Sequence, residues 1–277
     1  MCCFVVLIAV RSFQTVVENT MSSKKVNRRE KIEEIVLERG AISVGSLAET
    51  LGVSTQTIRR DIDELCVGDT LLRRHGRVEM DPKQLNTPFD QRAGTNLAGK
   101  RDIGEAAAEL IPDGATVFIS IGSTPLAVAR AMQRRKRLTV ITNNLSAAMA
   151  LSEEVSNRII IPGGEVRLPD RDILGDEVTA LFDKYRADFG IFGAAGIADD
   201  GALLEFHVAE VHAREQIRQN SRVSVLVIDS TKFGRLAPAV GESLLDVDHV
   251  IVDRRPGPQF DSLLDQLNGR LVLAERD

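Results

Sequence analysis

Tryptophan is absent from the sequence, and aromatic residues together make up only 4% of the chain. Proteins that hold single-stranded nucleic acid commonly stack the bases on aromatic side chains, so this scarcity disfavours that mode of recognition. Cysteine is also scarce: only Cys2, Cys3 and Cys66 occur, and their spacing matches no metal-ligand pattern. These residues predict neither a disulfide framework nor a zinc site, and they fit a reducing cytoplasm.

A strong net charge and the common catalytic motifs are missing as well. The net charge is −5, so any contact with DNA must come from a local basic surface and not from the field of a polycation. The chain has no His/Cys cluster, no GxSxG motif, no Walker A loop and no GxGxxG that opens a βαβ unit. The sequence therefore predicts no metal site, no cofactor and no catalytic residue.

No apolar run is long enough to cross a bilayer as a helix, so a membrane is not an expected partner. The run at residues 2–10 could be the core of a signal peptide, but it lacks a basic segment and a clear small-x-small cleavage site. The interpretation that we prefer is that Met21 is the true start. Residues 1–20 would then be an upstream extension or a disordered segment.

A chain of 277 residues can form one large domain or two ordinary ones. Residues 81–99 are polar and contain Pro82 and Pro88, which predicts a linker. The expected organisation is therefore a small domain over residues 24–80 and a larger one over residues 100–277.

The stretch at residues 53–62 in the first domain has the pattern of a helix. Ser54 can accept a hydrogen bond from the first turn, and Ile58, Ile62 and Leu65 recur at the spacing of one buried face. The opposite face suits a major groove, because Gln can bond adenine and Arg can bond guanine or phosphate. An ordinary amphipathic helix with a solvated basic face would show the same pattern. The residues of that opposite face are Gln56, Arg59 and Arg60.

The flanking sequence favours the DNA-reading interpretation. A helical pattern at residues 28–39 ends at Gly40, a second short helix follows Ser43, and Gly52 marks a tight turn before the third. This order predicts a helix-turn-helix with a leading support helix. Residues 71–78 then predict a basic hairpin whose arginines would contact phosphates. The candidate DNA-contacting residues are Ser54, Thr55, Gln56, Thr57, Arg59, Arg60, Arg73, Arg74, His75 and Arg77.

Beyond the linker, continuous apolar runs alternate with helical stretches, which predicts an α/β fold with a largely parallel sheet covered on both faces. The expected strands lie at residues 116–120, 138–142, 158–161, 189–192, 223–228, 249–252 and 271–273, and the expected helices at 125–132, 145–151 and 207–219.

Several of the predicted strands are followed by glycine or small polar residues, which would meet at one edge of the sheet, where ligands bind in such folds. The segment at residues 121–125 opens a helix, so its N–H groups and hydroxyls could cradle a phosphate. Each segment alone could be an ordinary turn, but their recurrence predicts a pocket for a small anion. The candidate effector-binding residues are Gly122, Ser123, Thr124, Asn143, Asn144, Gly163, Gly164, Glu205, Lys232 and Arg235.

An enzyme is the alternative from a different class. Asp199, Asp200 and Glu205 lie near the predicted pocket and could act as acid or base. The interpretation that we favour assigns them to a solvated turn and to a contact with a ligand hydroxyl.

Taken together, these motifs resemble the DeoR family of bacterial repressors. The segments at residues 53–61 and 71–76 look like its winged helix-turn-helix. The Gly-Ser-Thr, Thr-Asn-Asn, Pro-Gly-Gly and Asp-Ser-Thr-Lys-Phe-Gly-Arg segments look like its sugar-phosphate sensor domain, which is similar in fold to ribose-5-phosphate isomerase and coenzyme A transferases. The resemblance spans residues 28–253 and is most marked to those members that respond to glycerol 3-phosphate, on the stretches at residues 86–88, 121–125, 141–145, 203–206 and 232–235.

The chain also departs from the family pattern. The turn of the hairpin has Arg77 and Val78 where the family usually has Gly-Ala, and Ser120 and Ala195 stand where it often has Asp. His212 replaces a basic residue that is common in the late helix. The lost carboxylates are groups that an isomerase would want, which argues further against catalysis.

The resemblance implies a cytoplasmic homodimer or homotetramer that binds double-stranded operator DNA and releases it when a phosphorylated small-molecule effector enters the second domain. Glycerol 3-phosphate is the favoured effector, and a carbohydrate or glycerol catabolic operon is the favoured target. The alternatives are an isomerase- or transferase-like enzyme fused to a DNA-binding module, and an activator that senses a different sugar phosphate.

Overall fold

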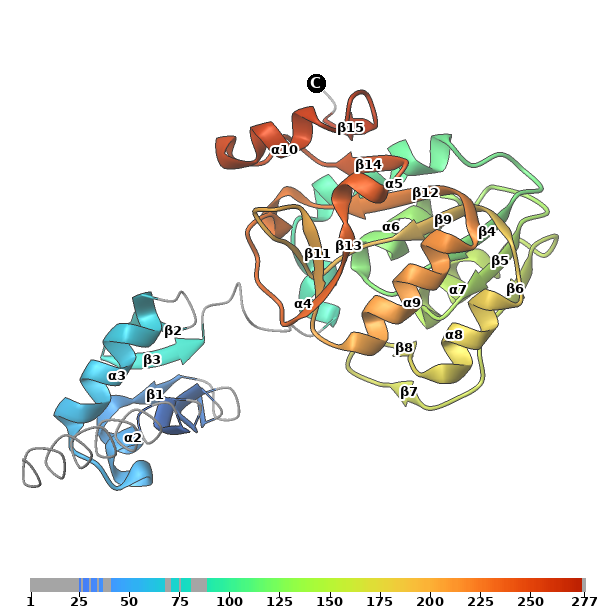
Figure 1. Ribbon diagram of the computed structural model, residues 1–277. Coiled ribbons are helices and arrows are strands. Elements are labelled where there is room, and N and C mark those ends of the chain that lie inside the picture. Colours follow the sequence, from blue (N-terminus) through green and yellow to red (C-terminus); the bar gives the residue numbers. More distant parts are fainter. Residues whose placement is uncertain are drawn as a thin grey trace, which may run out of the picture. The chain divides into compact units, whose positions relative to one another are not determined.

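The computed structural model describes residues 25, 27–29, 31–33, 35–36, 41–67, 71–74, 76–80 and 89–275. The chain divides into two compact units, Met1–Leu85 and Asn86–Asp277 (Figure 1). The predicted extension at residues 1–20, the candidate DNA contact His75 and the first part of the predicted linker, residues 81–88, lie outside the described residues.

Local capping signals set the helices of the N-terminal unit. The side chain of Ser43 accepts a hydrogen bond from the Ser46 N–H at the start of α2, and Gly52 ends that helix at a φ of 63°, which glycine adopts without strain. The Ser54 hydroxyl accepts a hydrogen bond of 3.1 Å from the Thr57 N–H at the start of α3, so the predicted cap is confirmed. The helices are α2 (Val44–Leu51) and α3 (Thr55–Val67).

The hairpin predicted at residues 71–78 is present as β2 (Leu71–Arg74) and β3 (Arg77–Met80), with Arg74 opposite Arg77. The short strand β1 (Ile42–Ser43) pairs with the other side of β3. The unit is therefore a helix-turn-helix followed by a wing. Its core contains Ile32, Val36, Ile42, Leu47, Ile58, Ile62, Leu71 and Val78.

The C-terminal unit is built on a seven-stranded parallel sheet, which confirms the predicted fold class. The strand order is β15-β14-β12-β9-β4-β5-β6, so strands that are distant in sequence lie side by side at the centre. The strands are β4 (Thr116–Ile119), β5 (Thr139–Thr142), β6 (Arg158–Ile160), β9 (Ala187–Phe192), β12 (Ser221–Ile228), β14 (His249–Val252) and β15 (Leu271–Leu273).

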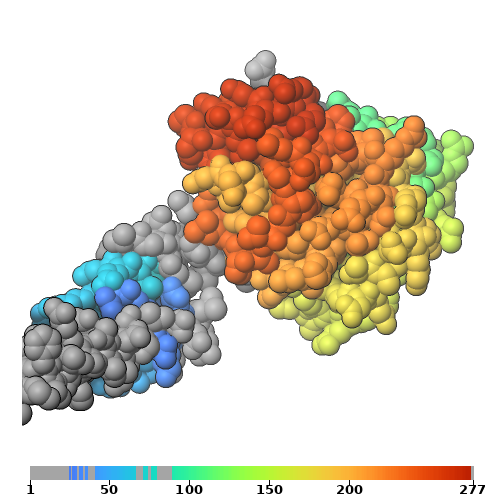
Figure 2. Space-filling model, in the orientation of Figure 1, coloured from blue at the N-terminus to red at the C-terminus, as the bar shows by residue number. Residues whose placement is uncertain are grey.

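Alternate side chains of each strand enter separate cores on the two faces of this sheet. Val117 and Ile119 pack with one set of helices, whereas Phe118 between them packs with the other. Figure 1 shows α8 (Asp176–Asp183) and α9 (Val208–Gln219) in front of the sheet, and in Figure 2 the yellow and orange atoms of this part of the chain form the surface on that side. None of the helices in the described ranges is long and apolar enough to cross a membrane. One face is covered by α5 (Leu97–Glu109), α6 (Ser123–Ala131) and α7 (Leu145–Leu151), and the other by α8 (Asp176–Asp183), α9 (Val208–Gln219) and α10 (Asp261–Asp265).

Two smaller β-structures lie in the segments that connect strands of the central sheet. The first is a three-stranded antiparallel sheet of β10 (Gly196–Ile197), β11 (Ala202–Glu205) and β13 (Ala239–Ser243). The second is a hairpin of β7 (Val166–Arg167) and β8 (Asp172–Ile173), whose loop is formed by residues 168–171. The first supplies Glu205 to the lining of the candidate pocket, and the second contacts the lining residue Arg92 through Asp170.

The second half of the predicted linker is not a linker. Residues 89–99 form α4 (Phe89–Gly94) and the start of α5, and Phe89 is buried in the core of the C-terminal unit. Prolines and polar residues in the preceding segment suggested an extended connection, but Phe89 supplies the apolar anchor that fixes a helix here. The linker prediction is therefore wrong for these residues.

Candidate functional site

The outer face of α3 carries the predicted DNA-contacting side chains. Gln56, Arg59 and Arg60 are exposed, whereas Ile58 and Ile62 are fully buried on the opposite side. Ser54 and Thr55 at the start of the helix are also exposed, and Thr57 is half-buried. This arrangement leaves two arginines and one glutamine free to enter a groove while the helix stays attached to its core.

A buried ion pair fixes the orientation of α3, and the sequence did not suggest it. Asp61 is only 1% exposed, although it lies in the middle of a polar helix. Arg28 from the leading helix donates from Nε to its carboxylate at 2.6 Å, and Arg29 lies 3.6 Å away. Because the buried carboxylate would be costly without these partners, the pair ties α3 to the leading helix.

The arginines of the wing differ in their surroundings. Arg73 forms an ion pair of 3.1 Å with Asp63 on α3, which connects the wing to the candidate reading helix. Arg77 is exposed and donates a hydrogen bond to the backbone oxygen of Ala41. The side chain of Arg74 lies outside the described part of the chain, as does His75.

A pocket opens in the C-terminal unit at the C-terminal ends of β4, β9 and β12, where a parallel sheet is expected to bind ligands. Residues 120–124, which we call the phosphate loop, follow β4 and enter α6. Gly122 has a φ of 111°, a conformation that side-chain-bearing residues rarely adopt. Ser123 and Thr124 in the first turn of α6 line the pocket, and the N–H groups of a first helical turn, which have no partner within the helix, can serve as donors for an anion.

Cationic side chains line the same pocket. Lys232 and Arg235 come from the segment after β12, and Arg92 comes from α4. Burial, together with the neighbouring charge of Arg235, lowers the pKa of Lys232 to about 8. The guanidinium of Arg235 stacks over the ring of Phe206 at 5.3 Å and donates to the Ala195 oxygen at 3.3 Å. The pocket therefore combines backbone donors with three positive charges.

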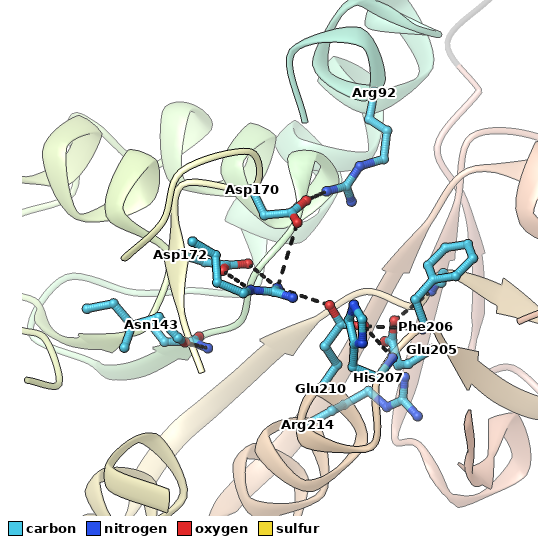
Figure 3. Close-up of polar contacts among 12 residues, drawn as sticks. Arg92, Asn143, Asp170, Asp172, Glu205, Phe206, His207, Glu210 and Arg214 are labelled. Atoms are coloured by element: carbon cyan, nitrogen blue, oxygen red, sulfur yellow. Dashed lines mark hydrogen bonds and ion pairs between the residues drawn. The ribbon is translucent and has the colours of Figure 1, made fainter. Parts of the chain in front are cut away.

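Two carboxylates complete the lining. Glu205 accepts hydrogen bonds from the Ala195 N–H at 3.1 Å and from Arg214 at 2.5 Å. Burial raises the pKa of Glu205 to about 7, although Arg214 acts in the opposite direction. Glu210 accepts from the N–H groups of Phe206 and His207 and from Arg167 (Figure 3). Both carboxylates are thus held in place by other groups of the protein.

The structure brings together six of the predicted effector-binding residues and separates the others. Gly122, Ser123, Thr124, Glu205, Lys232 and Arg235 line the pocket, whereas Asn143, Asn144, Gly163 and Gly164 do not. The placement expected for these four is corrected, and strand order explains the difference. They follow β5 and β6, which lie between the pocket and one end of the sheet.

Asn143 and Asn144 have supporting positions. The side chain of Asn144 donates hydrogen bonds to the backbone oxygens of Ser120 and Gly122 at 3.2 and 3.1 Å, so it fixes the backbone of the phosphate loop. Asn143 is fully buried and donates to the Ile173 oxygen of β8 at 3.0 Å.

Sequence reasoning missed Arg92, Phe206 and Glu210 as lining residues. Arg92 was hidden in the segment assigned to the linker. Glu210 had a usable signal, because a glutamate three residues after the N-cap residue of a helix, here His207, commonly accepts a hydrogen bond from the N–H of that residue. Asp199 and Asp200, which were considered as acids or bases, do not line the pocket, and Asp200 instead accepts from the Ala202 N–H at 3.0 Å. No group of His, Cys, Asp or Glu in the described ranges is arranged to hold a metal.

Comparison with known proteins gives matches over both units. Residues 28–84 match the model of the DeoR-like helix-turn-helix domain, and residues 95–254 match that of the DeoR C terminal sensor domain. The chain is 42% identical over 233 residues to the glycerol-3-phosphate regulon repressor of Escherichia coli K12, covering 84% of this chain and 92% of that protein. The repressor of the same name from Haemophilus influenzae is 36% identical, with coverage of 84% and 91%.

A third relative is the HTH-type transcriptional repressor CsqR of E. coli K12, which is 33% identical over 90% of this chain and 96% of its own length. Two solved structures resemble the chain at lower sequence identity. Ribose 5-phosphate isomerase A from Methanocaldococcus jannaschii has 17% identity and a TM-score of 0.38 over 50% of this chain and 55% of its own. The eIF2B delta subunit from Chaetomium thermophilum has 14% identity and a TM-score of 0.42, with coverage of 61% and 67%.

Proposed function

The chain belongs to the DeoR family of transcriptional regulators, and from this premise we propose that it represses a carbohydrate or glycerol catabolic operon. The proposed effector is a phosphorylated small molecule that releases the protein from its operator, and glycerol 3-phosphate is the favoured one. The observation that carries the proposal is the convergence of the phosphate loop with Lys232 and Arg235 in one pocket. In addition, the relatives from E. coli and H. influenzae are named repressors of the glycerol-3-phosphate regulon.

The DNA-binding part of the proposal assigns roles to the two faces of α3. Arg59, Arg60 and Gln56 contact base edges or phosphates in the major groove, since all three are exposed. Ser54, Thr55 and Thr57 position the start of the helix, and the wing contacts the backbone. A dimer or tetramer in the cytoplasm would place two such helices on paired half-sites of double-stranded DNA.

The effector part of the proposal places the phosphate on the first turn of α6. Ser123 and Thr124 offer hydroxyl and N–H donors there, while Lys232 supplies charge. Glu205 accepts a hydrogen bond from a hydroxyl of the effector. The ligand shifts the protein away from its operator only by the difference in its affinity for the DNA-bound and released arrangements.

The rival function is catalysis on a sugar phosphate, and the raised pKa of Glu205, about 7, is the observation in its favour. Against it, the two oxygens of Glu205 are held by the Ala195 N–H and by Arg214, which suits a fixed acceptor for an effector hydroxyl better than a group that moves a proton. Turnover of ribose 5-phosphate or a related sugar phosphate by the purified protein would decide for the enzyme.

The direct test measures release from DNA. Operator sequences are first selected from random double-stranded DNA with the full chain, and binding is then followed by fluorescence anisotropy. Glycerol 3-phosphate is expected to release the labelled operator, whereas glycerol is not, because it lacks the group held by the phosphate loop. If no phosphate ester caused release at millimolar concentration, the assignment of the pocket as a phosphate sensor would be wrong.

The affinity for the effector should depend on pH through Lys232. Its pKa of about 8 should rise in the complex, because a phosphate dianion stabilises the ammonium form. Below pH 8 the titration of Lys232 should therefore leave the affinity for the effector unchanged. Above pH 8 the affinity should fall by up to about tenfold per pH unit. The ester itself does not interfere, since its second pKa is about 6.

Isothermal titration calorimetry between pH 7 and 9.5 measures this dependence. Lys232→Met should bind more weakly at pH 7 and should lose the decline above pH 8. Lys184→Met is the matched control, because Lys184 is exposed at the end of α8 and lies outside the pocket lining. An unchanged decline in Lys232→Met would assign the titration to another group.

A further inference from the structure

Helix α4 is fastened to the loop of the β7–β8 hairpin. The Phe89 N–H donates to the Pro169 oxygen at 3.3 Å, and Arg171 forms an ion pair of 2.7 Å with Asp90. Arg171 also lies over the Phe89 ring at 5.6 Å. Residues 81–88, which lead in sequence to the DNA-binding unit, directly precede this helix. The contact between α4 and residues 168–171 is therefore adjacent in sequence to the connection between the units.

Arg92 takes part both in this contact and in the pocket. It projects from α4 and lines the pocket, and its guanidinium donates to Asp170 of the hairpin loop (Figure 3). Its Nε is buried and has no hydrogen-bond partner among the residues that the structure describes. A buried N–H without a partner is costly, so this atom is a donor available to a ligand.

Asp170 is the counter-ion of Arg92 in a strongly cationic setting. Its side chain is 13% exposed, and the positive charge of Arg92 contributes to the lowered pKa values of Lys232 and Lys100. A phosphate placed on the phosphate loop would enter the same field with two negative charges. A phosphate that bonded both Nε and Nη2 would compete with Asp170 for Nη2, since arginine bonds phosphate and carboxylate through the same forked geometry.

Asp170 keeps a second cationic neighbour when its ion pair with Arg92 is broken. Arg167 on β7 lies 4.0 Å from Asp170, and it also pairs with Asp172 at 2.8 Å and Glu210 at 3.0 Å. The hairpin is held from behind as well, because the Leu145 N–H donates to the Arg171 oxygen at 3.1 Å. The hairpin thus stays in place while α4 is released.

The other end of α4 has an independent attachment. The ammonium of Lys100 on α5 donates to the backbone oxygens of Thr95, at 2.7 Å, and Arg92. Loss of the Arg92–Asp170 pair would therefore weaken the attachment of α4 to the hairpin loop and keep the Thr95 end fixed.

We propose that Arg92 is a switch residue, which pairs with Asp170 in the operator-binding state and exchanges Asp170 for the phosphate of the effector in the released state. This inference rests on the proposed function and adds the coupling to it. The exchange loosens α4 from the hairpin loop and so changes the connection to the DNA-binding unit. The Arg92–Asp170 pair is present only in the operator-binding state. Its free energy therefore stabilises that state and opposes the binding of the effector.

Because the pair couples the two binding equilibria, one substitution should change the affinity for the effector and the affinity for the operator in opposite directions. Asp170→Asn removes the competing carboxylate, so the full chain should bind glycerol 3-phosphate roughly three- to tenfold more tightly. Its affinity for the operator without effector should fall by a similar factor. Calorimetry with glycerol 3-phosphate and with inorganic phosphate measures the first shift, and anisotropy with labelled operator measures the second.

Two further variants keep the test specific. Asp261→Asn breaks an exposed ion pair with Arg255 that lies outside both the α4–hairpin contact and the pocket lining, so both affinities should stay within about twofold. Arg92→Gln removes the pair and the phosphate contact together, so both affinities should fall. A merely structural role of Arg92 would leave the affinity for inorganic phosphate unchanged.

The outcomes separate this inference from the proposed function. Weaker or unchanged phosphate binding in a folded Asp170→Asn variant would overturn the exchange, even if the wild-type chain responds to glycerol 3-phosphate. Should Asp170→Asn fail to fold, Arg92→Gln decides alone, and unchanged phosphate affinity in it refutes the switch. If the wild-type chain bound no phosphate at all, the proposed function would fall, and the switch with it.

Discussion

Replacing Arg59 and Arg60 together by alanine is expected to weaken operator binding by roughly two to three orders of magnitude, since each bidentate contact to a base contributes about 1–3 kcal/mol. Both side chains are exposed on α3, on the face opposite the buried Ile58 and Ile62. Their removal should leave the core of the unit intact. The melting temperature should therefore stay unchanged while the anisotropy titration with operator DNA shifts.

Arg158→Ala is the matched control, because it removes one exposed arginine from β6 of the other unit. The single variants add information on the kind of contact. A side chain that reads a base should lose affinity mainly for the selected operator, whereas one that contacts phosphate should lose affinity for all sequences alike. If the double variant bound the operator with unchanged affinity, α3 would not be part of the DNA interface.

Replacing Arg214 by leucine is expected to lower the free energy of unfolding of the C-terminal unit by about 3–5 kcal/mol, because it leaves buried carboxylates without their counter-ion. Arg214 is 1% exposed and is paired with Glu205 at 2.5 Å and with Glu242 at 3.2 Å. It also donates to the Leu203 oxygen at 3.2 Å. Urea denaturation should show the loss in the transition that reports this unit, since two units need not unfold together.

Arg218→Leu provides the comparison on the same helix. Arg218 is 27% exposed, and its Nε lies 3.9 Å from Glu242, so its removal should cost far less. A second test uses Gly241, where an added Cβ would lie 2.3 Å from the Arg214 guanidinium. Gly241→Ala should therefore also destabilise the unit, because a buried arginine has little room to move. Similar unfolding free energies for Arg214→Leu and Arg218→Leu would contradict the importance of the buried network.

The features that the sequence predicted well are those that local chemistry controls. Ser54 caps α3 and Gly52 ends α2 because both effects act within one turn of helix. The exposed position of Gln56 and Arg59 follows from the helical period, once Ile58 and Ile62 are buried. The parallel sheet was predicted for the same kind of reason, since strands that are buried on both faces are apolar throughout.

The pocket was only partly predictable, because strand order in space differs from strand order in sequence. β9 lies between β4 and β12, so the segments that follow these three strands meet at the pocket. Asn143 and Gly163 follow strands that are near β4 in sequence but lie towards the edge of the sheet. The hydrophobic pattern of a strand carries no information on its neighbours, so the sequence could not distinguish these loops.

By itself, then, the sequence determined the two units, the exposed polar face of α3 and the glycine-containing turn that opens α6, because each depends on neighbours within a few residues. Only the tertiary structure placed Asp61 against Arg28, Arg214 between two glutamates, and Arg92 between the pocket and Asp170. A charged residue in a helix is expected on the surface, and its burial becomes favourable only when a distant part of the chain supplies the opposite charge. That pairing is a property of the fold, which is why a segment assigned to a linker proved to hold the residue that we propose couples the pocket to DNA.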